Sequence, residues 1–91
     1  TIYKALEVIS KLSKIKAILV NLFGGIVRTD LVAQAILNAY QDGMISVPIY
    51  ARISGAESEK SKEMLSNSNA KLYDTVEEAI SSLVQYKELS K

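Results

Sequence analysis

Apolar residues follow two different spacings along this chain. Residues 15–20 form a nearly continuous apolar run, which is typical of a strand buried on both faces of a parallel sheet. After Gly24 and Gly25 the apolar residues recur every three or four positions, which is the spacing of one buried helix face. The members of that face are Leu31, Val32, Ala35, Ile36, Ala39 and Tyr40. The pattern therefore predicts a strand, a Gly-Gly turn and a helix in series.

The same two spacings predict the remaining elements. Residues 2–12 form an amphipathic pattern typical of a helix, and two further helices are expected after residues 56 and 75. The order helix, strand, helix, strand, helix, strand, helix predicts an α/β fold, with right-handed crossovers and helices on both faces of a three-stranded parallel sheet. The expected strands are residues 15–21, 47–53 and 70–73. Since no other predicted strand would pair with the first, we expect one open sheet edge.

Capping signals mark the ends of the predicted helices. A short polar side chain can accept a hydrogen bond from a free amide at a helix start, and a glycine can end a helix in the left-handed conformation. Thr29 and Asp30 are the expected caps of the helix after the glycine pair, although this helix could start as early as Ile26. The other expected caps are Gly43 at the end of that helix, Ser54 with Glu57 as a capping box, and Asp74 or Thr75, each with a glutamate three residues later.

Gly24 and Gly25 mark the candidate binding site. A turn from a strand into a helix points main-chain N–H groups, with the positive end of the helix dipole behind them, at a position where an anion can bind. Glycine lets a ligand approach the main chain closely because it has no Cβ. The alternative is that the pair only makes the turn. The sequence lacks the lysine of a phosphate loop, and Asp30 already places a negative charge in the first helical turn.

Arg52, near the end of the second predicted strand, is a candidate partner for the same site. The carboxyl ends of parallel strands share one rim of a sheet, so Arg52 is expected on the rim that carries Gly24 and Gly25. Two interpretations stay open. The guanidinium either pairs with an anion at the rim or reaches solvent.

The amino-acid composition excludes several kinds of catalytic and metal-binding site. With 91 residues the chain makes at most one domain. It has no cysteine and no histidine, which excludes disulfides, thiolate metal sites and a Ser/His or Cys/His catalytic pair built from this chain alone. The net charge is +1, lysines alternate with glutamates, and no apolar run reaches membrane-spanning length. We therefore expect a soluble intracellular protein that binds neither nucleic acid nor membrane.

Residues 16–30 carry a specific resemblance. Their sequence, KAILVNLFGGIVRTD, resembles the Val-Asn-Ile-Phe-Gly-Gly-Ile-Val-Arg pattern of succinyl-CoA synthetase β subunits, with Leu22 as one conservative change. The resemblance covers nearly all of the chain and places it in the carboxy-terminal CoA-ligase domain of that family. The chain departs from the family at Thr29, where many members have cysteine, and at Ser54 and Glu57, where the family commonly reads Glu-Gly-Thr/Asn-Asn.

The resemblance implies a flavodoxin-like domain of five parallel strands, of which this chain would supply the last three. Residues 1–91 would then be the C-terminal part of one CoA-ligase domain, with two upstream strands and a nucleotide-grasping domain outside the sequence. The family interconverts succinyl-CoA, NDP and phosphate with succinate, CoA and NTP through a phosphohistidine on the α subunit. By itself the chain is expected to be an inactive fragment of this ligase.

The resemblance also implies ligands and site residues. Main-chain amides of the glycine-rich corner would face phosphate and succinate, and no residue of this chain would be catalytic or bind a metal. Magnesium and ATP or GTP would bind elsewhere in the full enzyme, CoA would be a substrate, and the α subunit would be the protein partner. The implied phosphate- and succinate-binding residues are Gly24, Gly25, Ile26 and Val27, with Asn21 and Arg28 in supporting roles.

Two other functions are compatible with the sequence. One is that of a related acyl-CoA synthetase, such as malate–CoA ligase or the matching part of an ATP-citrate lyase. The other is that of a flavodoxin-like interaction module that binds a partner and no substrate. We expect the isolated chain to self-associate through the open strand edge at residues 15–20. The resemblance implies a prokaryotic cytoplasm or a mitochondrial matrix as the location.

Overall fold

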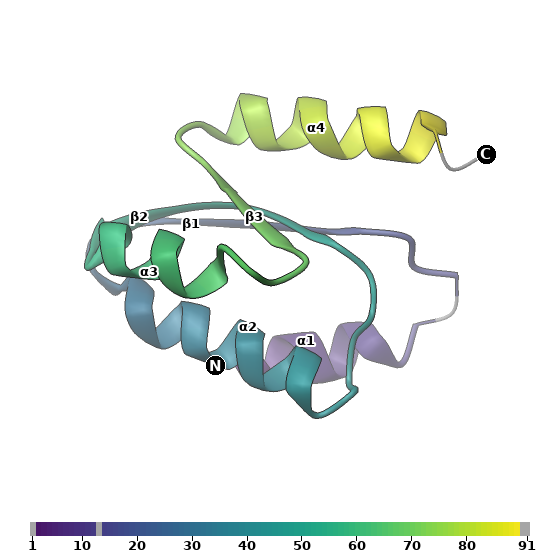
Figure 1. Ribbon diagram of the computed structural model, residues 1–91, viewed down its shortest axis with the longest axis horizontal. Helices are drawn as coiled ribbons and strands as arrows, with labels where there is room; N and C mark the ends of the chain where they lie inside the picture. Colours follow the sequence, from purple (N-terminus) through teal and green to yellow (C-terminus); the bar gives the residue numbers. More distant parts are fainter. Residues whose placement is uncertain (1, 13, 90–91) are drawn as a thin grey trace.

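A computed structural model describes residues 2–12 and 14–89, and for residues 24–27 and 56 it gives the strand but no side chains. Helices and strands alternate along the described part of the chain (Figure 1). In order, the elements are α1 (Ile2–Ser10), β1 (Ile18–Arg28), α2 (Thr29–Gln41), β2 (Ile49–Ala56), α3 (Ser58–Leu65), β3 (Ala70–Tyr73) and α4 (Val76–Leu89). This is the order that the hydrophobic pattern predicts.

The three strands form one parallel sheet in the order β1-β2-β3. Ile18 of β1 lies beside Ile49 of β2, and Arg52 of β2 lies beside Tyr73 of β3. The predicted α/β fold with a three-stranded parallel sheet is therefore confirmed. Among the described residues, no strand pairs with the outer edge of β1 or of β3.

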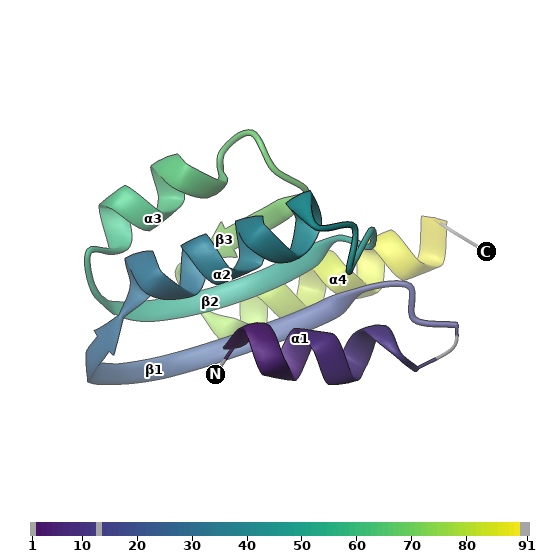
Figure 2. The same ribbon diagram turned by 90° about the horizontal axis from the view of Figure 1, so that it is seen from below.

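The helices cover the two faces of the sheet unequally. α1, α2 and α3 lie on one face, and α4 lies alone on the other (Figures 1 and 2). On the α4 side, the ring of Tyr50 lies 6.3 Å from that of Tyr73 and 6.1 Å from that of Tyr86. The main buried cluster consists of Leu6, Ile18, Ala33, Ile36, Ala39, Ile45, Ile49, Ala51, Ile53, Leu65 and Ala70. The core thus lies mainly between the sheet and the three-helix layer.

The strand starts follow from pairing between strands. β1 begins at Ile18 rather than at residue 15, because its ladder with β2 begins there and the Ile18 amide donates to the Pro48 carbonyl at 3.0 Å. β2 runs over Ile49–Ala56 rather than residues 47–53, since its ladder with β1 continues to its last residue. β3 has the predicted bounds.

The end of β1 differs most from the prediction. β1 spans Gly24 and Gly25 and continues to Arg28, and its pairing with β2 shifts register between Phe23 and Arg28. The irregularity lies at the glycine pair, and the ribbon of β1 bends sharply at this end of the sheet (Figure 2), so the predicted change of direction occurs, but within β1. A helix start before Thr29 is wrong. The strand-to-helix junction lies three residues beyond the glycines, after Arg28, which pairs with Ala56 of β2.

The predicted end of α2 is confirmed. Gly43 has a φ of +73°, in the left-handed region that favours glycine. Its N–H donates to the Tyr40 carbonyl at 3.1 Å, and the N–H of Met44 donates to the Ala39 carbonyl at 3.0 Å. These two bonds form a Schellman motif, which satisfies carbonyls left free at the end of the helix.

The predicted N-cap of α4 is confirmed for one of its two candidates. The Thr75 hydroxyl oxygen accepts a hydrogen bond from the Glu78 N–H at 3.1 Å, and the two side chains also bond at 3.1 Å. Asp74, the other candidate, accepts a hydrogen bond from Nζ of Lys62 at 3.3 Å. Thr75 therefore fixes the start of α4.

The predicted caps of α2 and α3 are wrong. The capping box fails because Ser54 lies inside β2, and Glu57, at the N-cap of α3, has a left-handed φ of 67° and makes no side-chain capping bond. At α2 the N-cap residue is Arg28, while Thr29 and Asp30 already belong to the first helical turn. At α3 the extension of β2 to Ala56 moves the helix start beyond the position that the capping box indicates, whereas α2 begins at Thr29, at the predicted cap itself.

Candidate functional site

The candidate site is the rim where β1 and β2 end and α2 and α3 begin. Arg28, the last residue of β1, lies beside Ala56, the last residue of β2. α2 starts at the residue after Arg28, and α3 starts two residues after Ala56. Carboxyl ends of neighbouring parallel strands are where ligands bind in open α/β sheets.

The predicted anion-binding stretch belongs to this rim by its place in the chain. Gly24, Gly25, Ile26 and Val27 immediately precede Arg28 in β1. The structure gives their strand but no side chains, so the geometry of the predicted amide site lies outside the described residues. The binding role of these four residues stays a prediction.

Arg28 and Asp30 form a two-point ion pair at the start of α2. Nε of Arg28 donates to Oδ1 of Asp30 at 3.1 Å, and Nη2 donates to Oδ2 at 2.8 Å. The Asp30 side chain is only 10% exposed, whereas that of Arg28 is 56% exposed. The Arg28 guanidinium holds the pKa of Asp30 below its usual range, and Asp30 in turn raises the pKa of Arg28. The first turn of α2 is thereby tied to the end of β1.

A second link joins the start of α2 to α3. Oγ of Ser61 lies 2.7 Å from Oγ1 of Thr29, and both residues are completely buried. Oγ of Ser61 also lies 2.9 Å from the carbonyl oxygen of Glu57, which directly precedes α3. Hydroxyl groups are rarely buried without such partners, because an unpaired one costs free energy in the interior.

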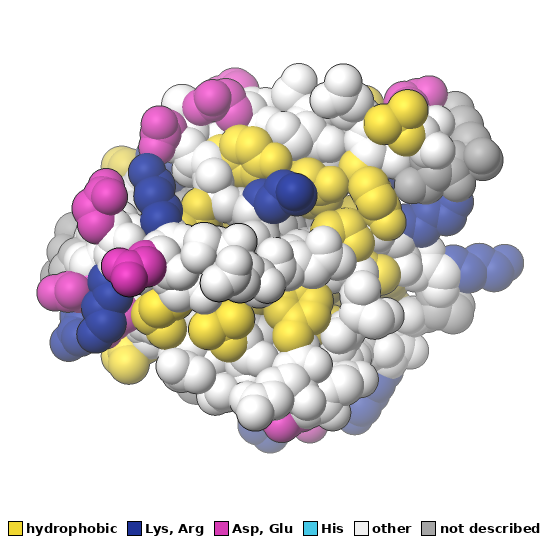
Figure 3. Space-filling model, viewed as in Figure 1, with side chains coloured by type: hydrophobic (Ala, Val, Ile, Leu, Met, Phe, Trp, Pro, Cys, Tyr) yellow, Lys and Arg dark blue, Asp and Glu magenta, His cyan; other side chains and the backbone are white. Residues whose placement is uncertain are grey.

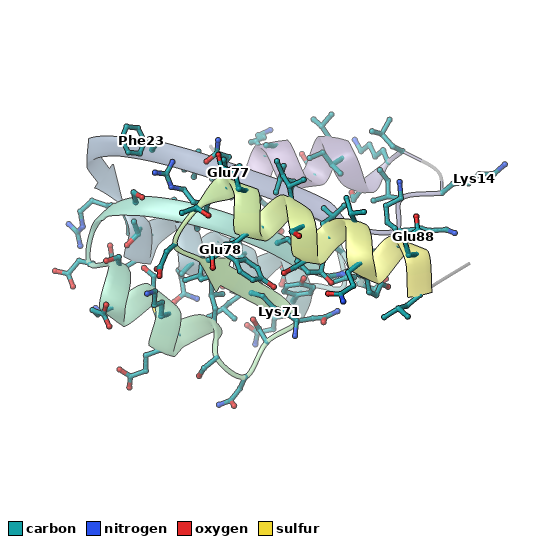
Figure 4. The ribbon with its side chains drawn as sticks, turned by 90° about the horizontal axis from the view of Figure 1, so that it is seen from above. Lys14, Phe23, Lys71, Glu77, Glu78 and Glu88 are labelled. Carbon is teal, nitrogen blue, oxygen red and sulfur yellow. The ribbon has the colours of Figure 1, made fainter. Side chains whose placement is uncertain are left out.

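Arg52 forms a third cluster on the opposite face of the sheet. Its Nη1 donates to Oδ1 of Asn21, its neighbour in the ladder, at 3.5 Å, the long end of hydrogen-bond range. Its Cζ lies 4.4 Å from the centre of the Phe23 ring, a cation–π geometry. Its Nε is buried and has no hydrogen-bond partner in the described part of the chain. Figure 4 shows Phe23 at this end of the sheet and Lys14 at the other.

The structure joins some of the predicted residues and separates others. Arg52 lies beside Asn21, four residues before the end of β2, and its guanidinium lies over the ring of Phe23, the residue before Gly24. The expected anion contact of Arg52 stays a prediction. Asn21 and Arg28, the two predicted supporting residues, belong to different clusters: Asn21 contacts Arg52, and Arg28 pairs with Asp30. Two residues of these clusters, Phe23 and Ser61, were not predicted from the sequence. Phe23 is two residues from Asn21, and this spacing along a strand would have indicated that both side chains lie on the same face. Ser61 lies in a polar helix, and nothing in its sequence indicates that it is buried.

The Arg28–Asp30 pair predicts a specific dependence of stability on pH. The pKa of Asp30 is lowered in the folded chain, so the pair stabilises the fold above the ordinary value of 3.8 and this contribution is lost as pH falls through the lowered native pKa. We expect the free energy of unfolding to fall more steeply below about pH 4 in the parent chain than in Asp30→Asn. Urea unfolding between roughly pH 6 and pH 2 measures both slopes.

Arg28→Gln is the matched control for this pH prediction. It removes the cause of the pKa shift but keeps the carboxyl group, so its slope should also be shallower than that of the parent chain. Equal acid slopes in the parent, Asp30→Asn and Arg28→Gln would show that the ion pair does not contribute.

Other surfaces of the described residues lie away from the rim. A hollow of about 460 Å³ lies near the amino ends of β2 and β3, lined among others by Pro48, Lys71 and Tyr86. Figure 3 shows hydrophobic side chains gathered along α4 and beneath it. The described residues contain no cluster of three acidic, histidine or cysteine side chains able to bind a metal, and no helix among them is long and apolar enough to span a membrane.

Comparison with known proteins gives one consistent result. A sequence model of the CoA-ligase family matches residues 1–87. The chain is 48% identical over 69 residues to the β subunit of an ADP-forming succinate–CoA ligase from Rickettsia typhi, covering 76% of this chain and 18% of that protein. It is 37% identical over 84 residues to a hydrogenosomal ADP-forming β subunit from Neocallimastix frontalis, covering 90% of this chain and 19% of that protein. It is 34% identical over 83 residues to a GDP-forming β subunit from Thermus thermophilus, covering 91% of this chain and 22% of that protein. The chain thus spans about a fifth of the length of these relatives.

Proposed function

Because this chain belongs to the CoA-ligase family, we propose that it is the carboxy-terminal part of a succinyl-CoA synthetase β subunit. The observation that carries the proposal is the family match over residues 1–87, with relatives that are named succinate–CoA ligase β subunits. The three-stranded parallel sheet with helices on both faces agrees with the C-terminal part of such a domain.

The proposed reaction converts succinate, CoA and NTP into succinyl-CoA, NDP and phosphate, and runs in both directions. A phosphoryl group passes through a histidine of the α subunit and through succinyl phosphate. This chain has no histidine and no cysteine, which agrees with a role in binding and positioning while other chains carry the nucleophile. Nucleotide, with Mg²⁺, would bind in another part of the β subunit, and CoA would be a substrate.

In this proposal the rim supplies main-chain hydrogen-bond donors. Amides of Gly24, Gly25, Ile26 and Val27, near the amino end of α2, would face phosphate and a carboxylate of succinate. Fixed donors stabilise developing negative charge without reorganising during the reaction. The ion pair of Arg28 with Asp30 supports this arrangement, since it ties the first turn of α2 to the end of β1.

The sheet topology supports a further strand beside β1. α2 connects β1 to β2 on one face of the sheet, and α1 precedes β1 on the same face (Figure 2). Connections between parallel strands are right-handed in about 98% of cases, so a strand preceding α1 would pair with β1 on the side away from β2. That side is free among the described residues. We therefore propose that upstream strands of the same β subunit complete the sheet at this edge.

An assay of the full-length β subunit with its α subunit tests the proposed function. We expect thioester formation that requires succinate, CoA and a nucleoside triphosphate together, with malate and citrate as weaker acceptors. An assembled complex that forms malyl-CoA or citryl-CoA in preference would assign a related acyl-CoA synthetase. An assembled complex that forms no acyl-CoA thioester at all would contradict an enzymatic role.

The open edge of β1 predicts self-association of the isolated chain. Leu19 lies on this edge strand and is 40% exposed, although it is a large apolar residue. An unpaired strand edge flanked by apolar side chains is a template for pairing with a second copy. We expect Leu19→Lys to raise the dissociation constant by about tenfold, or about 1.4 kcal/mol, in sedimentation equilibrium. Leu31→Lys, at an exposed position on α2, should leave it unchanged, and a strictly monomeric parent chain at high concentration would refute the prediction.

A further inference from the structure

The buried hydroxyl pair between α2 and α3 is unusual for its position. Thr29 is the first residue of α2 and Ser61 lies in the middle of α3, and neither is exposed to solvent. The other large side chains that are completely buried are Leu6, Ile36, Ile49 and Leu65, all of them apolar. Two hydroxyl groups are therefore placed in the interior at the point where the candidate site begins.

The pair extends into a chain of three groups. A serine hydroxyl has one proton, so Ser61 cannot donate to both Thr29 and the Glu57 carbonyl at once. Since the Glu57 carbonyl oxygen can only accept, Ser61 bonds to both groups when it donates to that carbonyl (2.9 Å) and accepts from the Thr29 hydroxyl (2.7 Å). The first turn of α2 is then linked through Ser61 of α3 to Glu57, the residue that joins β2 to α3.

Stability alone does not explain hydroxyls at these two positions. Replacing both partners of a buried hydrogen bond by apolar groups of the same shape can be nearly neutral or stabilising. A hydrogen bond adds direction, because it weakens steeply when its angle departs from linearity. The pair therefore fixes how the start of α2 sits against α3, in a way that an apolar contact between the same helices would not.

We propose that Thr29 and Ser61 are positioning residues for the anion-binding corner of the enzyme, an inference that rests on the proposed function. Thr29 follows Arg28 directly, and residues 24–27 come just before it, so a shift of the α2 amino end moves the proposed amide donors. Displacement of a binding group by about 1 Å can cost about 100-fold in rate. The Arg28–Asp30 pair restrains the same turn against β1, and the hydroxyl pair restrains it against α3.

The experiment uses the full-length β subunit assembled with its α subunit. Thr29→Val keeps the shape of threonine and removes the hydroxyl, whereas Thr29→Ser keeps the hydroxyl and removes the methyl group. We expect Thr29→Val and Ser61→Ala each to raise the KM for succinate and for phosphate on the order of fivefold to tenfold, the size of one lost buried hydrogen bond. Thr29→Ser should stay close to the parent enzyme, and the KM for the nucleotide should not change in any variant. The double variant should be no worse than either single one, because both break the same link.

The outcomes separate this inference from the proposed function. If Thr29→Ser raises the KM for succinate and phosphate as much as Thr29→Val does, the role of Thr29 is packing and the inference is overturned. The same holds if the KM for the nucleotide rises as much as the other two. If Thr29→Val fails to assemble, the comparison of Ser61→Ala with Thr29→Ser decides in the same way. Gly25→Val serves as the reference for the proposed site. If it impairs the enzyme while Thr29→Val and Ser61→Ala leave every KM unchanged, only the positioning role fails; if it has no effect, the proposed site itself fails.

Discussion

Replacing Ile36 by alanine is expected to lower the free energy of unfolding by about 2 to 5 kcal/mol. Ile36 is completely buried on the face of α2 that belongs to the core cluster, so the truncation removes apolar contacts and leaves a cavity. A chain of 91 residues has a total stability of roughly 5 to 14 kcal/mol, and short chains bury a smaller share of their surface. The loss is therefore a large share of the total stability if that total lies near the lower end of its range.

Urea unfolding of the parent chain and two controls measures this effect. Ile36→Val removes one methylene group and should cost about 0.5 to 1.5 kcal/mol. Leu31→Ala truncates a residue of the same helix that is 63% exposed, and it should change stability by less than about 0.5 kcal/mol. An effect of Ile36→Ala no larger than that of Leu31→Ala would contradict the assignment of the core.

The hydrophobic pattern was sufficient to predict the architecture. Short apolar runs and period-3.6 spacing identified the strands and helices in their observed order, and Gly43 was correctly assigned as the end of α2. These features depend on short stretches of sequence, because a helix face or a left-handed glycine is specified by neighbouring residues. The open outer edge of β1 was also expected from the number of strands.

The element boundaries at the rim could not be predicted in the same way. The extension of β1 to Arg28 depends on pairing with β2, whose residues lie far away in the sequence. Ser54 and Glu57 have the spacing of a capping box, but the ladder keeps Ser54 in the strand. Tertiary pairing thus overrides local capping preference at the start of α3.

For the same reason, only part of the candidate site could be predicted from the sequence. Strand order indicated that Arg52 lies toward the end of the sheet that carries the glycines, and the register placed it beside Asn21. The Arg28–Asp30 pair depends on where the helix begins, and the sequence left this start open between Ile26 and the residues that follow Thr29 and Asp30. Ser61 is polar and lies in the most polar helix, so only the packing of α3 against α2 identifies it as a buried partner of Thr29.

The apolar face of α4 illustrates a further limit. Val76, Ala79, Ile80, Leu83 and Val84 have the spacing of one buried face. In the structure Ala79 is buried, while Ile80 and Val84 are among the exposed large apolar residues. α4 is the only helix on its face of the sheet among those described, so these side chains lack neighbours there (Figure 1). We expect the upstream part of the proposed β subunit to cover them.

The central claim is that the glycine-rich end of β1 binds the anionic groups of the reaction. Gly25→Val in the full-length β subunit, assembled with its α subunit, tests it most directly, because a branched side chain would occupy the space that the amides need for a ligand. We expect phosphohistidine formation from ATP or succinyl-CoA formation to fall by at least about 100-fold, as when a fixed hydrogen-bond donor to a developing charge is lost. Leu31→Val, at an exposed position on α2, should leave both rates unchanged. An assembled Gly25→Val complex with both rates unchanged would contradict the claim, since these glycines would then serve only the fold.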